Sequence, residues 1–204
     1  MQNYSQNNEQ EIMTNYFGSK LGRLLDIGAN DGETLSNSRQ LILNGWRGDL
    51  VEPAPIPFGK LTELYRENDK VNLHDVAVCD YSGMMNFFVS GEHLGKGDCG
   101  LLSTLSLADK QKWEASTQYH EVTVQTFTWK DFQTVSGSFK YDFISIDAEG
   151  YDLKILEQMD LLDLGCSMVC IEHNGIDINK YVDYLKKFNM KVLLVNAENI
   201  IAAI

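Results

Sequence analysis

The chain has 204 residues, of which 44% are hydrophobic and 23% are charged, and this balance predicts a folded domain rather than a disordered segment. Its formal net charge is −12 and its pI is about 4.7. Because so acidic a surface repels a phosphate backbone, we expect no nucleic-acid partner. The first ten residues are polar and no apolar run approaches the ~20 residues of a membrane span, so we expect no membrane partner and a cytoplasmic location.

Strand-like and helix-like patterns alternate along the chain. In chain order, the predicted strands lie at 23–28, 49–52, 71–78, 141–147, 166–173, 191–195 and 200–204. The predicted helices lie at 31–44, 58–68, 150–162 and 177–188. Near-continuous apolar strands that alternate with helices indicate a mostly parallel sheet covered on both faces.

The end of the chain departs from this alternation. Residues 191–195 and 200–204 are joined by only four residues, too few for a crossover helix, so these two strands should pair antiparallel. The predicted fold class is therefore a doubly wound, Rossmann-like α/β fold with a mostly parallel seven-stranded sheet and an antiparallel strand near the C-terminus. This is the architecture typical of class I methyltransferases.

Residues 84–131 contain no repeated strand–helix unit. They hold the strand-like run MNFFVS, the glycine-rich run GEHLGKGDCG, a short helical pattern at 107–115 and the alternating run HEVTVQTFTW. Long irregular segments inside compact domains are usually functional. We therefore predict one domain over 1–204, in which 84–131 is an insertion that covers the substrate and Trp113 lies on its helix.

A glycine-rich turn follows the first predicted strand in the run LLDIGANDGETL. Asp26 closes the strand, and Gly28 and Gly32 flank a turn where the backbone can approach a ligand closely. The spacing differs from the GxGxxG of dinucleotide sites, and Asp26 and Asp31 stand where a pyrophosphate would lie. These acids favour a ligand with a cationic amine and a sulfonium, while a purely structural turn is the alternative.

Acidic residues also follow three other predicted strands. Glu52 ends the second strand, where a carboxylate can accept the ribose hydroxyls of an adenosyl group while Pro53 packs on the adenine. Its alternative is an exposed loop acid. Asp147 and Glu149 follow the fourth strand, where helix capping is the alternative role. The fifth strand ends in the run CIEHN, which we expect to lie beside Asp147.

These motifs together resemble the FkbM family of S-adenosylmethionine (SAM)-dependent methyltransferases, from LLDIGANDGETLSNSRQLILNGWRGDLVEPAPIPFGKL to YDFISIDAEGYDLKIL and CIEHN. The resemblance implies a class I fold, SAM as the methyl donor and O-methylation of a hydroxyl on a sugar or other small-molecule or glycan acceptor. It also implies roles for individual residues. Gly28, Asn30, Gly32 and Glu52 would contact SAM, Val76 and Ala77 would line the adenine, and Asp147 and Glu149 would lie at the catalytic edge.

An alcohol must lose its proton during methyl transfer, which calls for a base or a metal ion. We expect His173 to be that base, oriented by Asp147 or Glu149, with a structural histidine as the alternative. A second hypothesis is a Mg²⁺ site formed by Asp147, Glu172 and Asn174, since oxygen ligands suit this ion.

Two other function classes stay open at this point. A non-catalytic module that binds SAM or a nucleoside would share the same cofactor residues, because a fold does not guarantee activity. An NAD-dependent oxidoreductase is disfavoured by the glycine spacing and by Asp31. The sequence predicts neither the identity of the acceptor nor the oligomeric state.

Overall fold

A computed structural model describes residues 2–95 and 97–204. Its main feature is a seven-stranded sheet in the order β3-β2-β1-β7-β8-β10-β9. The strands are β1 (Arg23–Ile27), β2 (Arg47–Val51), β3 (Val71–His74), β7 (Phe143–Ile146), β8 (Met168–Glu172), β9 (Lys191–Val195) and β10 (Asn199–Ala203). The first five in the order pair parallel, and β10 pairs antiparallel with both β8 and β9. This arrangement confirms the predicted fold class.

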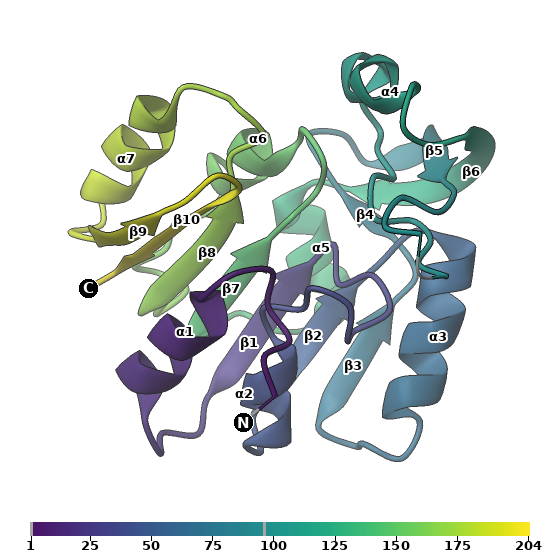
Figure 1. Cartoon of the computed structure of the whole chain (residues 1–204). Helices are drawn as coiled ribbons and strands as arrows, with labels where there is room; N and C mark the ends of the chain where they lie inside the picture. The colour runs from purple at the N-terminus through teal and green to yellow at the C-terminus, as the bar shows by residue number, and fades with distance from the viewer. Residues whose placement is uncertain (1, 96) are drawn as a thin grey trace.

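Helices cover both faces of the sheet (Figure 1). On one face lie α1 (Glu9–Phe17), α2 (Arg39–Leu43) and α3 (Pro55–Tyr65); on the other lie α5 (Trp129–Ser136), α6 (Asp152–Leu156) and α7 (Ile178–Lys186). Successive strand residues point to opposite faces, so the neighbours Leu24 and Leu25 belong to two different cores. Both faces of β1 are buried, and this explains why its sequence RLLDI has apolar residues on both faces.

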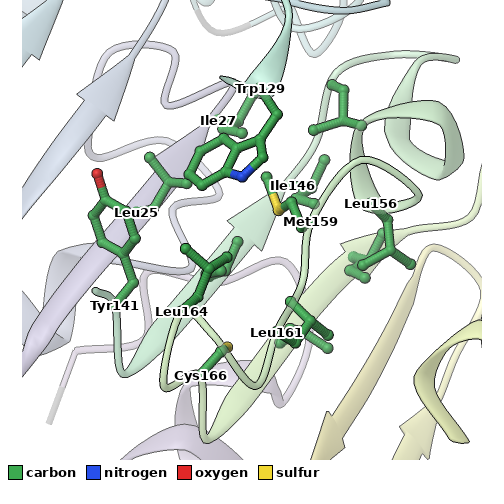
Figure 2. Packing of buried hydrophobic residues seen from close by; sticks show 14 of the residues in the cluster. Leu25, Ile27, Trp129, Tyr141, Ile146, Leu156, Met159, Leu161, Leu164 and Cys166 are labelled. Atoms are coloured by element: carbon green, nitrogen blue, oxygen red, sulfur yellow. The ribbon is translucent and has the colours of Figure 1, made fainter. Parts of the chain in front are cut away.

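The core under α5 and α6 contains the larger group of buried side chains. Figure 2 shows Trp129 and Tyr141 among aliphatic side chains from β1, β7 and the 156–166 segment. The two aromatic rings lie 6.2 Å apart between centroids, and Phe132 lies 6.0 Å from Trp129. This packing fixes β1 and β7 side by side, and the ends of these two strands carry residues of the candidate site.

The insertion, together with the residues from Ala77 that precede it, forms a small sheet in the order β4-β6-β5. It consists of β4 (Ala77–Val78), β5 (Gly83–Ser90) and β6 (Tyr119–Phe127), and the β5–β6 connection contains α4 (Leu107–Trp113). In Figure 1 this unit stands at the upper right, toward the carboxyl ends of β1 and β2. Ala54, Ala77, Phe87, Val89 and Val124 form its separate core.

Several predicted boundaries were wrong for identifiable reasons. The helix expected at 31–44 is shortened to α2, because the Asp31 carboxylate accepts the N–H groups of Glu33 and Thr34 and closes a turn there. The predicted strand 71–78 is divided between the two sheets as β3 and β4. The helix expected at 150–162 contains only the five residues of α6. Helices α1 and α5 were not predicted.

Within the described ranges, no helix has both the length and the apolar character needed to cross a membrane.

Candidate functional site

A cavity of about 260 Å³ lies where the carboxyl ends of β1, β2, β7 and β8 meet. Parallel strands bring their carboxyl ends to one edge of the sheet, so acids from four separate motifs converge there. Those lining the cavity are Asp26, Glu52, Asp147, Glu149 and Glu172. Gly28, Asn30, Pro53 and Ala77, which were also predicted site residues, line the same cavity.

The turn after β1 needs glycine at its first position. Gly28 has φ +86°, and a Cβ there would lie 1.7 Å from the carbonyl oxygen of Asp147. The N–H groups of Gly28 and Ala29 both donate to the carbonyl of Val51, each at 3.0 Å. These bonds hold the turn against the end of β2. Gly32, in contrast, packs toward Leu61 and does not line the cavity.

Glu52 is buried at the end of β2, with only 4% of its surface exposed. Its carboxylate accepts the N–H of Asn30 at 2.9 Å and the N–H of Ala54 at 2.7 Å. Burial raises the pKa of Glu52 to about 8, and the nearby Asp147 and Asp26 add to the rise. The carboxylate is thus fixed in direction, and a hydroxyl donor or a positive charge in the cavity would stabilise its ionised form.

Asp26 lies at the end of β1 and is also almost fully buried. The hydroxyl of Ser38 donates to its carboxylate at 2.5 Å. Burial raises the pKa of Asp26 to about 6 despite this bond. The neighbouring Asn37 lines the cavity and has a buried Oδ1 with no hydrogen-bond partner in the described part of the chain.

The carboxyls of Asp147 and Glu172 form a hydrogen-bonded pair between β7 and β8. Burial raises the pKa of Asp147 to about 7, with a further contribution from the negative charge of Asp152. Burial likewise raises the pKa of Glu172 and of Glu149. With its pKa raised to about 7, Asp147 can accept or release a proton in the range where enzymes work.

The sequence profile of the methyltransferase FkbM domain matches residues 26–191, which include the five acids at the strand ends but not Glu198. The chain belongs to the FkbM methyltransferase family. No curated protein sequence is significantly similar to it.

Solved structures share the fold at low sequence identity. An FkbM methyltransferase from Methylobacillus flagellatus KT superposes with a TM-score of 0.60 at 13% identity over 90% of this chain, but over only 44% of its own length. A precorrin-6y C5,15-methyltransferase from Geobacter metallireducens GS-15 superposes with a TM-score of 0.52 at 12% identity, over 100% of this chain and 92% of its own length. The METTL16 methyltransferase domain superposes with a TM-score of 0.53 at 14% identity, over 96% of this chain and 66% of its own length. The chain therefore spans less than half of the first of these proteins, and the likeness to all three concerns the fold.

In this FkbM-family protein, His173 stands outside the cavity lining. Its Nδ1 accepts the N–H of Gly175 at 3.2 Å, and its Nε2 lies 3.2 Å from the carbonyl oxygen of Asn196. Both ring nitrogens are thus engaged with backbone groups. Because β8 side chains alternate, Glu172 points to the cavity while the next residue turns away. This placement does not support the expected role of His173 as the base.

The carboxylates that could hold a metal ion differ from the predicted Mg²⁺ ligands in one residue, because Asp152 takes the place of Asn174. The carboxylates that approach one another are those of Asp147, Asp152 and Glu172, with one oxygen of each within 4.8 Å of the others. Asn174 instead donates its amide to Asp152 and Glu172. Asp152 already accepts the N–H groups of Ala148 and Gly150, and this leaves it little capacity to bind a cation. These contacts fit an internally hydrogen-bonded cluster better than a Mg²⁺ site.

Two regions of the cavity wall were not anticipated as site residues. Gln6, Glu198 and Asn199 come from segments near the two ends of the chain, which are joined because Asn7 donates to Glu198 at 2.9 Å. Phe87, His93 and Leu102 come from the insertion, and Ala77 is accompanied by Val78 rather than by Val76, which packs into the core under α5. The alternation in MNFFVS was a usable signal for Phe87, whereas the loop and the chain ends offered none.

Proposed function

We propose that this FkbM-family protein transfers the methyl group of SAM to a hydroxyl of a sugar or another small molecule. The convergence of acids from four strand ends with a glycine turn in one cavity, with Asp26, Glu52 and Glu149 buried, is the observation that supports the proposal. When bound, SAM supplies an electrophilic methyl group on a positively charged sulfur. A cavity lined by carboxylates stabilises such a cation, whereas it would repel the pyrophosphate of a dinucleotide.

Each motif has a defined task in this proposal. Glu52, held by two backbone N–H groups, accepts the ribose hydroxyls, and Pro53, Ala77 and Val78 enclose the adenine. Gly28 allows the backbone to approach the cofactor. Asn37 offers its unpartnered Oδ1 to the cationic amine.

The Asp147–Glu172 pair and Glu149 remain for acid–base chemistry. These carboxyls line the cavity, and the raised pKa of Asp147 makes it a better proton acceptor near pH 7 than an ordinary aspartate. The backbone of Glu149 is held at φ +45°, and its carbonyl accepts the hydroxyl of Thr104 at 2.7 Å. This bond joins the catalytic edge to the insertion. Nucleic acid is not proposed as the acceptor, because the chain carries a net charge of −12.

Isothermal titration calorimetry with the demethylated cofactor, S-adenosylhomocysteine, tests the cofactor site. We expect binding to the native protein, no binding of NAD, and an affinity about 10- to 100-fold lower for Glu52→Gln, because the amide replaces one acceptor by a donor. Glu33→Gln is the matched control, since Glu33 is an exposed acid in the neighbouring turn. Equal affinity for Glu52→Gln and the native protein would refute the assignment. Cofactor binding with no methyl transfer to any acceptor would favour a non-catalytic module.

A further inference from the structure

One wall of the cavity belongs to the insertion rather than to the main sheet. Phe87 on β5 and Leu102 in the following loop are buried there, and Leu105 packs on the same small core. The insertion is tied to the strand ends at two points. Asn30 donates its side-chain amide to the carbonyl of Cys99 at 3.3 Å, and Thr104 bonds to the backbone of Glu149. This wall therefore faces the catalytic edge directly.

Two nitrogen-bearing rings, His93 and Trp113, complete the wall. The rings meet edge to face, with centroids 5.8 Å apart and an interplanar angle of 71°. The loop that carries His93 is fixed, because the carboxylate of Asp98 accepts the backbone N–H groups of His93 and Leu94 at 3.0 and 2.9 Å.

Each ring also presents a polar atom that the protein itself leaves unsatisfied. Nδ1 of His93 and Nε1 of Trp113 are buried and have no hydrogen-bond partner among the residues that the structure describes. Buried polar atoms are normally paired, so two such atoms on one cavity wall indicate that a ligand supplies the partners. The indole N–H can only donate, so its partner is an acceptor atom such as a hydroxyl oxygen.

The charge of the cavity restricts which ligand can approach this wall. Six acidic residues line the cavity, and its lining contains no Lys or Arg side chain within the described part of the chain. The lysines of α4 point to aromatic rings, with Lys110 over Phe88 at 4.6 Å and Lys112 over Trp113 at 4.9 Å. A phosphate or carboxylate in the cavity would meet six acids, whereas the Lys112 ammonium that lies over Trp113 already interacts with Glu149.

We propose that this wall is the acceptor subsite and that it takes an uncharged polyhydroxyl compound, the chemistry of a neutral sugar, whose hydroxyls bond to Trp113 and His93. The inference rests on the proposed methyl transfer. In that reaction the acceptor oxygen forms a bond to the methyl carbon, the carbon–sulfur bond breaks, and its electron pair goes to the sulfur. The hydroxyl proton goes to a carboxylate of the Asp147–Glu172 pair. Phosphorylated and carboxylated acceptors are excluded by the acids.

Methyl transfer from radiolabelled SAM to matched acceptors tests the proposal. The panel contains neutral methyl glycosides and cyclitols, with the 6-phosphate and uronate of each glycoside. We expect kcat/KM for neutral members to exceed that for their charged partners by about tenfold or more. Trp113→Phe keeps the ring but removes the donor, and we expect it to raise the acceptor KM about three- to tenfold while kcat changes little. Leu107→Ala, an exposed position on the same helix outside the cavity, should change neither.

Calorimetry with S-adenosylhomocysteine separates the two levels of inference. If the cofactor analogue does not bind, the proposed function fails. If it binds but charged members are preferred, no neutral member is methylated, or Trp113→Phe leaves the acceptor KM unchanged, the acceptor proposal alone is overturned.

Discussion

The cavity has two halves that are built differently. The half proposed to bind the cofactor, called the cofactor half, consists of the ends of β1, β2 and β7, where Asp26 and Glu52 are each 4% exposed and packed between two helix layers. Its other wall comes from the insertion, where α4 has no buried residue and His93 and Trp113 are partly exposed. The difference indicates that the cofactor half depends on the stability of the main sheet, whereas the insertion wall can change with little cost to folding.

The largest loss of stability should come from a change at the close backbone contact between Gly28 and Asp147, in the cofactor half. Gly28→Ala places a Cβ within 1.7 Å of the Asp147 carbonyl oxygen at φ +86°, so we expect a loss of about 3 kcal/mol or more in unfolding free energy. Gly137→Ala is the control, because it shares a positive φ but has nothing within 4 Å, and we expect it to cost about 1–2 kcal/mol. Urea denaturation measures both, and equal losses would contradict the crowding argument.

A buried acid away from the cavity should show the next largest effect. Asp49 is ion-paired with Arg23 at 2.7 Å and contacts His74 and Tyr141. Burial opposes its ionisation, but the bonds from His74, Asn72 and Arg23 prevail and lower its pKa. Asp49 therefore adds stability above its unfolded pKa, and that stability is lost as the pH falls toward its folded value. We expect Asp49→Asn to lower the unfolding free energy at pH 7 by about 3 kcal/mol.

The site acid Asp147 should behave in the opposite way. Its folded pKa of about 7 lies above the unfolded value of 3.8, so the folded state holds more protons between these values and stability falls as the pH rises through that range. We expect Asp147→Asn to increase the unfolding free energy of the cofactor-free protein at pH 8 by about 1–3 kcal/mol while it lowers methyl transfer. Denaturation curves at pH 5 and pH 8 check the sign. If Asp147→Asn instead lowers the unfolding free energy at pH 8, ionisation of Asp147 does not destabilise the folded state.

The insertion wall should give the smallest change in stability. Trp113→Ala removes a partly exposed ring from a helix without buried residues, so we expect a loss of less than about 1 kcal/mol. Trp129→Ala, in the core of Figure 2, should cost about 3–5 kcal/mol. Thermal unfolding of the two variants compares the regions directly, and similar losses would remove the distinction between them.

The same contrast explains what the sequence could predict. Apolar strands with acids at their ends determine which side chains meet, because parallel strands share one edge, and this was enough to locate Asp26, Glu52 and Asp147. The antiparallel pairing of the last two strands followed from the short connection between them. These features depend on local pattern and on topology alone.

The direction of the His173 side chain and the pairing of strands far apart in the chain could not be predicted from the sequence. Whether His173 faces the cavity depends on strand register and on a backbone carbonyl that lies 23 residues away. The pairing of β4 with β6 joins segments about 50 residues apart and includes only two residues of β4. The Asp31 turn replaced a helical turn through competing side-chain bonds, which periodicity does not detect.

The contact between the two chain ends has a practical consequence. Glu9 is fully buried and accepts the side-chain amides of Asn196 at 2.7 Å and Asn199 at 3.0 Å. Gln6, three residues earlier, is part of the cavity wall. Trimming or proteolytic clipping of the stretch before α1 would therefore open one side of the cavity and remove the bond from Asn7 to Glu198, although Glu9 itself would stay. Preparations intact at this end are the ones suited to binding measurements.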